Sequence, residues 1–263
     1  MRPLQLFPGL LAAAFVAAAC QQSVEAAAEA AEPAEEPKPL VLVAGATGGT
    51  GSLVVAELLK QGYPVRAFVR DAAKALERLG PEVEAVAGDL KDVASIAAAL
   101  EGVGAVINAA GAGAGGGEDN TPEKVDYEGA RNLAEAAHAA RASQYVLVSS
   151  RGVTDDDHYL NRMFNNVLKW KRKGEEAVAA SGIDYTIVRP GGLGDGEGGG
   201  QTIVFEQGDN RSEGIFINRA DVARVCVAAL QHDAARNKVF EIHAADGEPQ
   251  ADFGPDFEAL SGS

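Results

Sequence analysis

The chain has 263 residues with 38 acidic and 23 basic side chains, a formal net charge of −15. This acidity argues against a nucleic-acid-binding surface, because phosphate backbones require clustered Lys and Arg. Two cysteines are too few for a disulfide-framed mini-protein, and the four histidines are scattered without the spacing of metal ligands. The unusual feature is the 31 glycines, many of which are clustered.

The first 39 residues differ in composition from the rest. Residues 10–19 form an apolar run that is too short to span a bilayer but suits the core of a signal peptide. Ala17-Ala18-Ala19-Cys20 resembles a bacterial lipoprotein processing site, so residues 1–20 are predicted to be a signal peptide with Cys20 lipidated. The alternative is an uncleaved Ala-rich segment. Residues 21–39 are almost all Ala, Glu and Pro, which predicts a solvated linker.

From residue 40 onward, predicted strands and helices alternate. Apolar runs predict strands at 40–44, 65–69, 83–87, 103–109, 145–149 and 185–189. Helical patterns lie between them at 52–61, 71–79, 92–100, 123–140 and 166–181. This alternation predicts an α/β fold, a doubly wound parallel sheet between two layers of helices, with ligands beyond the carboxyl ends of its strands. We expect the domain to span 40–245, with residues 246–263 as a C-terminal tail.

A glycine loop, GATGGTG at 45–51, joins the first predicted strand to the first predicted helix. Gly45 would permit a tight turn, Gly48 would let the backbone approach a pyrophosphate, and Gly51 would let the helix pack on the strand. Free N–H groups at the start of the helix would meet the phosphates. A plain structural turn is the alternative, but the position of the loop predicts a dinucleotide site.

The end of the second predicted strand indicates which dinucleotide is bound. An NAD site places a carboxylate about 20 residues beyond the loop, on the ribose 2′-OH, whereas an Arg accommodates the 2′-phosphate of NADP. Arg70 lies at about that distance from Gly51, and Arg66 lies in the same strand. We therefore expect NADP, while Asp71 leaves NAD as the less favoured alternative. Arg70 could otherwise be a solvent-exposed charge that closes the strand.

Together these residues resemble a known superfamily, the short-chain dehydrogenases/reductases. The loop at 45–51, Gly88-Asp89-Leu90 after the third strand and VINAAG at 106–111 carry the resemblance. Four further segments narrow it to the atypical NAD(P)H-binding branch, the NmrA-like and flavin/biliverdin-reductase-like proteins: VDYEGARNL at 125–133, VSS at 148–150, YTIVRPG at 185–191 and RADVA at 219–223. The resemblance covers about residues 40–245 and implies a Rossmann-type fold.

The resemblance also implies a role for residues at matching positions. The pyrophosphate would be held by Gly45, Thr47, Gly48, Gly49, Thr50 and Gly51. Arg70 would meet the ribose phosphate, and Asp89 and Leu90 would border the adenine. The nicotinamide end would be lined by Ala109, Ala110, Gly111, Arg189, Pro190 and Gly191. The alternative for Arg189 is a buried structural salt bridge.

The catalytic pattern of the superfamily is broken in this chain. Typical members use Tyr-x-x-x-Lys, which places the general acid and its supporting Lys on one helical face. Lys171 matches the Lys, but Val167 stands four residues before it. We expect the proton donor to be absent, with Lys171 binding the cofactor ribose or belonging to a solvated basic cluster. Ser149, Ser150 and Lys171 are the candidate catalytic residues, and capping of the strand end is the alternative for the two serines.

The motifs that would bind the cofactor are intact in this sequence, whereas the catalytic Tyr-x-x-x-Lys pattern is broken. Two functions are consistent with this combination. The first is an NADPH-dependent oxidoreductase that acts on a flavin, a quinone or a similar small acceptor. The second is a non-catalytic NAD(P)-binding sensor or assembly factor. The expected partners are the dinucleotide and a small acceptor, with no nucleic acid, and membrane attachment only through Cys20. The expected location is the bacterial cell envelope, with the cytoplasm as the alternative.

Overall fold

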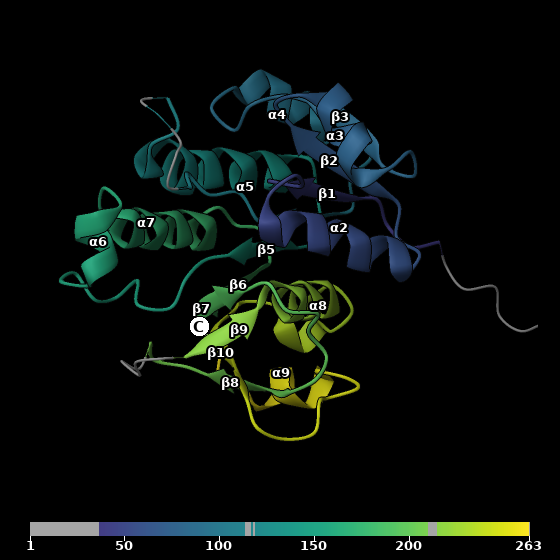
Figure 1. Cartoon of the computed structure of the whole chain (residues 1–263). Helices are drawn as coiled ribbons and strands as arrows, with labels where there is room; N and C mark the ends of the chain where they lie inside the picture. The colour runs from purple at the N-terminus through teal and green to yellow at the C-terminus, as the bar shows by residue number, and fades with distance from the viewer. Residues whose placement is uncertain (1–36, 114–116, 118, 210–214, 263) are drawn as a thin grey trace, which may run out of the picture. The chain divides into compact units, whose positions relative to one another are not determined.

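An eight-stranded sheet, in the order β3-β2-β1-β4-β5-β6-β10-β8, organises the structure (Figure 1). The computed structural model describes residues 37–113, 117, 119–209 and 215–262. Neighbouring strands run parallel except β10 and β8, which are antiparallel. The strands of this sheet are β1 (Val41–Ala44), β2 (Val65–Val69), β3 (Glu84–Ala87), β4 (Ala105–Asn108), β5 (Tyr145–Val148), β6 (Tyr185–Pro190), β8 (Thr202–Glu206) and β10 (Lys238–Ala245). A separate parallel pair is formed by β7 (Gly192–Gly194) and β9 (Phe216–Asn218).

Helices cover both faces of the sheet, because successive residues of each buried strand point to opposite sides. Val41 and Val43 belong to one apolar core, whereas Leu42 and Ala44 belong to the other. The first core is closed by α2 (Gly49–Lys60), α3 (Ala72–Leu79), α8 (Arg219–Ala229) and α9 (Gly254–Ala259). The second is closed by α4 (Val93–Ala99), α5 (Ala130–Ala139) and α7 (Val167–Ala180). The predicted doubly wound parallel sheet in three layers is therefore confirmed.

Shorter segments complete the chain. A π-helical segment, η1 (Glu123–Gly129), leads directly into α5, so the single helix expected over 123–140 begins with a wider turn. The short helix α6 (Tyr159–Met163) precedes α7, and a 3₁₀ turn, η2 (Asp233–Ala235), follows α8.

The C-terminal segment corrects the predicted domain boundary. Residues 246–263 were expected to form a tail, but Phe257 of α9 and the flanking residues Phe253 and Leu260 belong to the first core. Phe257 is fully buried, with its ring 5.8 Å from that of Phe240 on β10. Phe253, Phe257 and Leu260 have the helical spacing i, i+4 and i+7, but the run covers only eight residues, which is shorter than the window of about 11–18 residues over which such a pattern indicates a helix. At the other end, the compact unit begins at Lys38.

Candidate functional site: a dinucleotide cleft and a buried charge cluster

The glycine loop packs so tightly that side chains have no room. Gly45 has φ +74°, and a Cβ there would lie 2.6 Å from the amide nitrogen of Ala110, after β4. A Cβ at Gly51 would lie 2.1 Å from the carbonyl oxygen of Gly45. The loop closes through a hydrogen bond of 2.8 Å from the Gly48 amide to that same oxygen. The backbone at the start of α2 is thereby exposed to a ligand at close range, as a pyrophosphate cradle requires.

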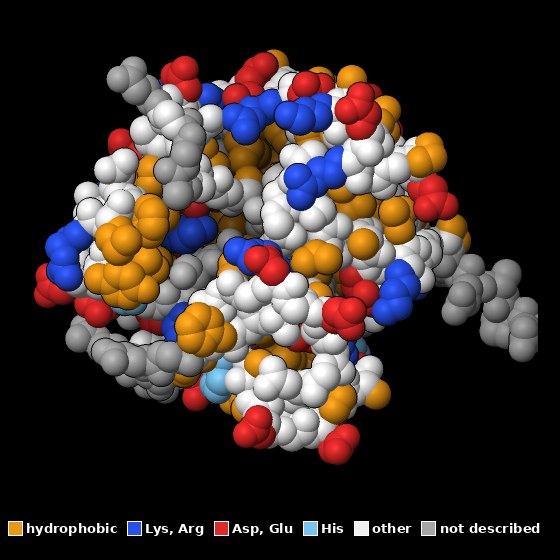
Figure 2. Space-filling view, viewed as in Figure 1, with side chains coloured by type: hydrophobic (Ala, Val, Ile, Leu, Met, Phe, Trp, Pro, Cys, Tyr) orange, Lys and Arg blue, Asp and Glu red, His pale blue; other side chains and the backbone are white. Residues whose placement is uncertain are grey.

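A cavity of about 370 Å³ opens beside this loop, at the carboxyl ends of β1, β2, β3 and β4. Figure 2 shows a hollow in this region, with Lys and Arg side chains on its border over α3 and α4. The walls of the cavity are formed by Gly45, Thr47, Gly48, Phe68, Val69, Arg70, Gly88, Asp89, Leu90, Ala109, Ala110, Gly111, Ala112, Asn120 and Val125. The structure thus brings most of the expected cofactor residues to one surface, while Gly49, Thr50 and Gly51 lie in the first turn of α2.

The three charged residues around β2 have different surroundings. Arg66 donates to the Glu84 carboxylate at 3.0 Å and to two backbone carbonyls, so its guanidinium is part of the scaffold. Asp71 caps α3, because its carboxylate accepts a hydrogen bond of 3.0 Å from the Lys74 amide. Arg70 is exposed and lines the cavity. Of the three, Arg70 therefore offers its charge to the cavity.

Lys171 lines a small adjoining pocket together with Asp126 and Ser149. Its Nζ lies 2.8 Å from the Asp126 carboxylate, which is 1% exposed and also accepts a hydrogen bond of 3.1 Å from the Ala112 amide. Gly174 permits this arrangement, because a Cβ there would lie 2.1 Å from the carbonyl oxygen of Asp126. Lys171 is therefore held at the junction of α7 and η1, and it does not belong to a freely solvated basic cluster.

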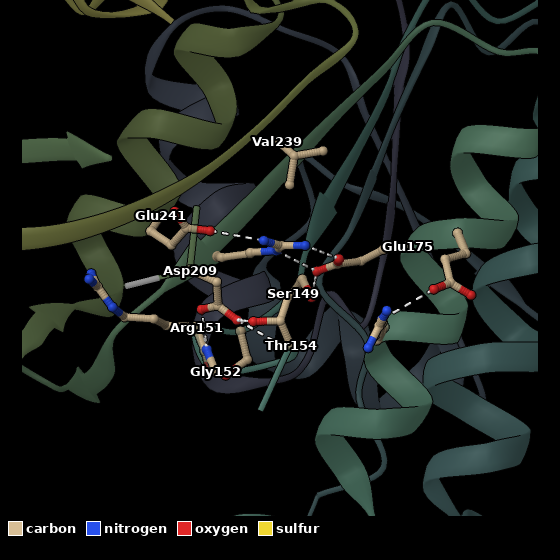
Figure 3. Close-up of polar contacts among 12 residues, drawn as sticks. Ser149, Arg151, Gly152, Thr154, Glu175, Asp209, Val239 and Glu241 are labelled. Carbon is tan, nitrogen blue, oxygen red and sulfur yellow. Dashed lines mark hydrogen bonds and ion pairs between the residues drawn. The ribbon is translucent and has the colours of Figure 1, made fainter. Parts of the chain in front are cut away.

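A buried charge cluster lies beyond the ends of β5 and β6. Figure 3 shows Ser149, Glu175 and Glu241 converging from β5, α7 and β10. The Ser149 hydroxyl donates to Glu175. Arg189 forms two hydrogen bonds with Glu175, at 3.0 and 2.6 Å, and one with Glu241 at 2.9 Å. Burial by itself would lower the pKa of Arg189, but these two carboxylates raise it above its ordinary value, so the guanidinium stays charged.

Two expectations were stated for Arg189, a place beside the nicotinamide with Pro190 and Gly191, and a buried structural salt bridge. None of these three residues lines either of the two hollows described above. The Arg189 guanidinium instead joins α7 to β10, which is the buried structural salt bridge named as the alternative. The sequence could not show this pairing, because Glu175 and Glu241 lie 14 and 52 residues from Arg189 in the chain. Ser150, the second candidate serine, donates to the adjacent Arg151 carbonyl at 3.0 Å.

Asp209 is a further buried acid that sequence reasoning missed. Its carboxylate accepts hydrogen bonds from the Gly152 amide at 2.6 Å and from the amide and hydroxyl of Thr154 at 2.8 Å each (Figure 3). Burial would raise the pKa of Asp209, but these donors lower it below its ordinary value. The loop after β5 is thus tied to the segment after β8.

Two other features bear on the chemistry. Tyr145 lies inside the sheet, where its hydroxyl accepts from Asn108 at 2.8 Å, and burial raises its pKa above the ordinary value. It is therefore a core residue and not an acid at the site. Within the described ranges, no group of His, Cys, Asp and Glu residues has the arrangement of a metal site.

Comparison with known proteins identifies the family. A model of an NAD(P)H-binding family matches residues 45–233, which is well over half of the chain. The chain belongs to this NAD(P)H-binding family. Sanguinarine reductase of Eschscholzia californica is 35% identical over 261 residues, covering 85% of this chain and 95% of that protein. The uncharacterized chloroplastic protein At2g37660 of Arabidopsis thaliana is 39% identical over 237 residues, covering 81% and 73%.

Solved structures of similar proteins agree with this membership in the NAD(P)H-binding family. A putative NAD-dependent epimerase/dehydratase from Bacillus halodurans has a TM-score of 0.73 and 28% identity, covering 84% of this chain and all of that one. The anaerobilin reductase ChuY of Escherichia coli has a TM-score of 0.67 and 29% identity, covering 80% and 100%. The resemblance to atypical dehydrogenases/reductases and the Rossmann-type fold are thereby confirmed.

The comparisons also correct the expected location. The prediction of a bacterial envelope lipoprotein is wrong, because curated relatives include chloroplastic plant proteins such as At2g37660 and TIC 62 of pea. TIC 62 is 43% identical over 175 residues, covering 59% of this chain and 33% of that protein. Cys20 and the segment 1–20 lie outside the described residues. In the part of the chain that is described, no helix has the length and apolar character needed to cross a membrane.

Proposed function

We propose that this member of the NAD(P)H-binding family is an NADPH-dependent oxidoreductase that reduces a small acceptor such as a flavin or a quinone. One observation carries the proposal: a cavity at the carboxyl ends of β1 to β4 is framed by the glycine loop and bordered by Arg70. A Cβ would fill the cradle at Gly45 or Gly51, so the shape of the loop fits a pyrophosphate pressed against the backbone. Two similar proteins named as reductases support the same reaction class.

The charges around β2 support NADP in preference to NAD. An NAD site needs a free carboxylate for the ribose 2′-OH. Asp71 stands near that place, but its carboxylate caps α3. Arg70 stands at the cavity wall with an exposed side chain, where its planar guanidinium can pair with the oxygens of a 2′-phosphate.

The chain's own residues supply binding and orientation in this proposal. When bound, the reduced nicotinamide supplies the hydride. In the proposal Lys171 donates a hydrogen bond to a ribose hydroxyl, and its ion pair with Asp126 supports this role by fixing the side chain. Ser149 is already donating to Glu175, and Val167 stands where the usual Tyr would be, so we assign no protein group as the proton donor. An acceptor that takes its proton from water, as a flavin or quinone does, suits such a site.

The full chain with NADPH and either FMN or menadione tests the proposal. We expect the absorbance at 340 nm to fall at a rate that is proportional to the protein concentration and saturates with the cofactor. No oxidation with any acceptor, despite binding, would favour the second candidate, a non-catalytic NAD(P)-binding sensor or assembly factor. That candidate is supported by the engagement of both Ser149 and Lys171 in internal contacts. Energy transfer from the single Trp to NADPH measures binding, and its absence would refute both candidates.

A further inference from the structure

Arg219, the first residue of α8, lies against the glycine loop. Its Nε and Cδ stand 3.0 and 3.1 Å from the position that a Cβ of Gly49 would occupy. Gly49 is the first residue of α2, so the Arg219 side chain occupies space that any other residue at 49 would take. A guanidinium is thereby brought to the helix end whose free N–H groups form the phosphate cradle.

The two helices begin at the same place and run in the same direction. At the N-terminal ends of α2 and α8, Arg219 contacts Gly49. Just beyond the C-terminal ends of the two helices, the side-chain amide of Gln231 donates to the side-chain oxygen of Gln61 at 2.5 Å. The positive ends of two helix dipoles therefore lie side by side at the loop, with the Arg219 charge between them. This concentration of positive potential favours an anion more than the α2 terminus does alone.

The anion that Arg219 meets in the structure is Asp195. The Arg219 Nη1 donates to the Asp195 carboxylate, which is 87% exposed, whereas the Arg219 side chain is only 25% exposed. Asp195 is presented by a glycine-rich segment that is tied to α8. The Gly196 amide donates to Asn218 at 3.1 Å, and the Gly199 amide donates to the buried Asp221 at 2.7 Å.

We infer that Arg219 is a contact for the dinucleotide pyrophosphate and that Asp195 competes with the pyrophosphate for its guanidinium. The inference rests on the proposed function, because it assigns a residue that lies beside the glycine loop of the proposed cofactor cleft. A pyrophosphate offers more charge and more acceptor oxygens than one solvated carboxylate, so the guanidinium favours it. Asp195 then lowers the affinity for the dinucleotide, and the glycine-rich segment that carries Asp195 is coupled to binding.

The test compares two substitutions that break the same ion pair. Kd values for NADPH are measured by energy transfer from the single Trp on the full chain. We expect Arg219→Ala to raise Kd about tenfold or more, as loss of charge-assisted hydrogen bonds implies. We expect Asp195→Asn to lower Kd by about twofold to fivefold, since it removes the competitor. If the pair served only the structure, both variants would shift Kd in the same direction or leave it unchanged, and either result would overturn the inference.

Two controls test whether Arg219 contacts the pyrophosphate and whether the effect is specific to this positive charge. Adenosine 2′-monophosphate, which carries neither phosphate of the pyrophosphate, should compete with NADPH for Arg219→Ala with an affinity within about threefold of that for wild type. A tenfold loss there would place Arg219 elsewhere on the ligand and overturn the assignment. Arg236→Ala also removes a positive charge, but Arg236 pairs with Asp184, which directly precedes β6 and so lies at the amino-terminal ends of the parallel strands, away from the cofactor cleft. This variant should leave the NADPH affinity unchanged. If wild-type protein bound no NADPH, the proposed function itself would fail.

Discussion

The carboxyl edge of the sheet has two halves that are built differently. At β1 to β4 the edge is open, and its shape depends on positions where no side chain fits, such as Gly45 and Gly51. At β5 and β6 the edge is closed by a buried cluster of paired charges, with Glu241 1% exposed and Glu175 6% exposed. Binding geometry in the first half thus comes from the backbone, whereas cohesion in the second half comes from ion pairs. Substitutions should therefore have separable effects on binding and on stability.

Removal of the shared cation should have the largest effect on stability. Arg189→Met leaves the buried carboxylates of Glu175 and Glu241 without their cation, which costs about 3–5 kcal/mol. Urea unfolding measures this loss. The matched control is Arg236→Met, whose partners Asp184 and Asp233 have side chains that are 46% and 92% exposed, and whose cost should stay under about 1 kcal/mol. Equal losses for the two variants would contradict the assigned role of the cluster.

The glycine loop should show the opposite pattern, in which binding suffers most. Gly45 and Gly62 have nearly the same backbone conformation, with φ of +74° and +77°, but a Cβ at Gly62 would meet nothing within 4 Å. Both Ala substitutions share the cost of a positive φ, about 1 kcal/mol. Only Gly45→Ala drives a Cβ against Ala110, so we expect it to weaken NADPH binding at least about 100-fold, or 2.7 kcal/mol. Similar binding losses in both variants would show that strain and not contact is responsible.

Discrimination between the two dinucleotides should depend on Arg70. We expect Arg70→Ala to raise the Kd for NADPH roughly 10–100-fold and to change the Kd for NADH little, because only the 2′-phosphate loses its partner. Asp71→Ala provides the control. It should cost about 1 kcal/mol of stability through loss of the α3 cap and leave the preference between NADPH and NADH unaltered. Weaker NADH binding in Asp71→Ala would instead assign Asp71 to the ribose.

The difference between the two halves also explains what sequence reasoning could reach. The glycine loop, the end of β3 and the end of β4 are local in sequence, because each ligand-facing residue directly follows a strand whose apolar run predicts it. Parallel strands bring such ends to one edge, so most of the residues that line the cavity could be expected there from the chain alone. The strand and helix alternation that underlies the fold is likewise local.

The second half could not be predicted in the same way. Arg189 forms hydrogen bonds with Glu175 from the preceding helix and with Glu241 from β10. No sequence pattern predicts that three charged residues from separate elements will be buried together. The expectation that Arg189 lies beside the cofactor came from the resemblance, and the buried salt bridge was only its alternative. Asp209 and α9 were missed for related reasons. Their partners lie in loops or on the far strands, and their importance depends on tertiary contacts and not on periodicity.

The smallest expected effect concerns pH, and it tests whether the loop after β5 depends on a charge. The pKa of Asp209 is lowered in the folded protein by its bonds to Gly152 and Thr154, so its ionised form stabilises the fold above the unfolded pKa of about 3.9. That contribution is lost as the pH falls through the lower folded pKa. Asp209→Asn should remove about 1–2 kcal/mol near neutral pH and progressively less as the pH falls through the folded pKa, because the wild-type carboxyl then becomes protonated as well. A stability difference that did not shrink as the pH fell toward acid unfolding would mean that the shape of Asp209, and not its charge, holds the loop.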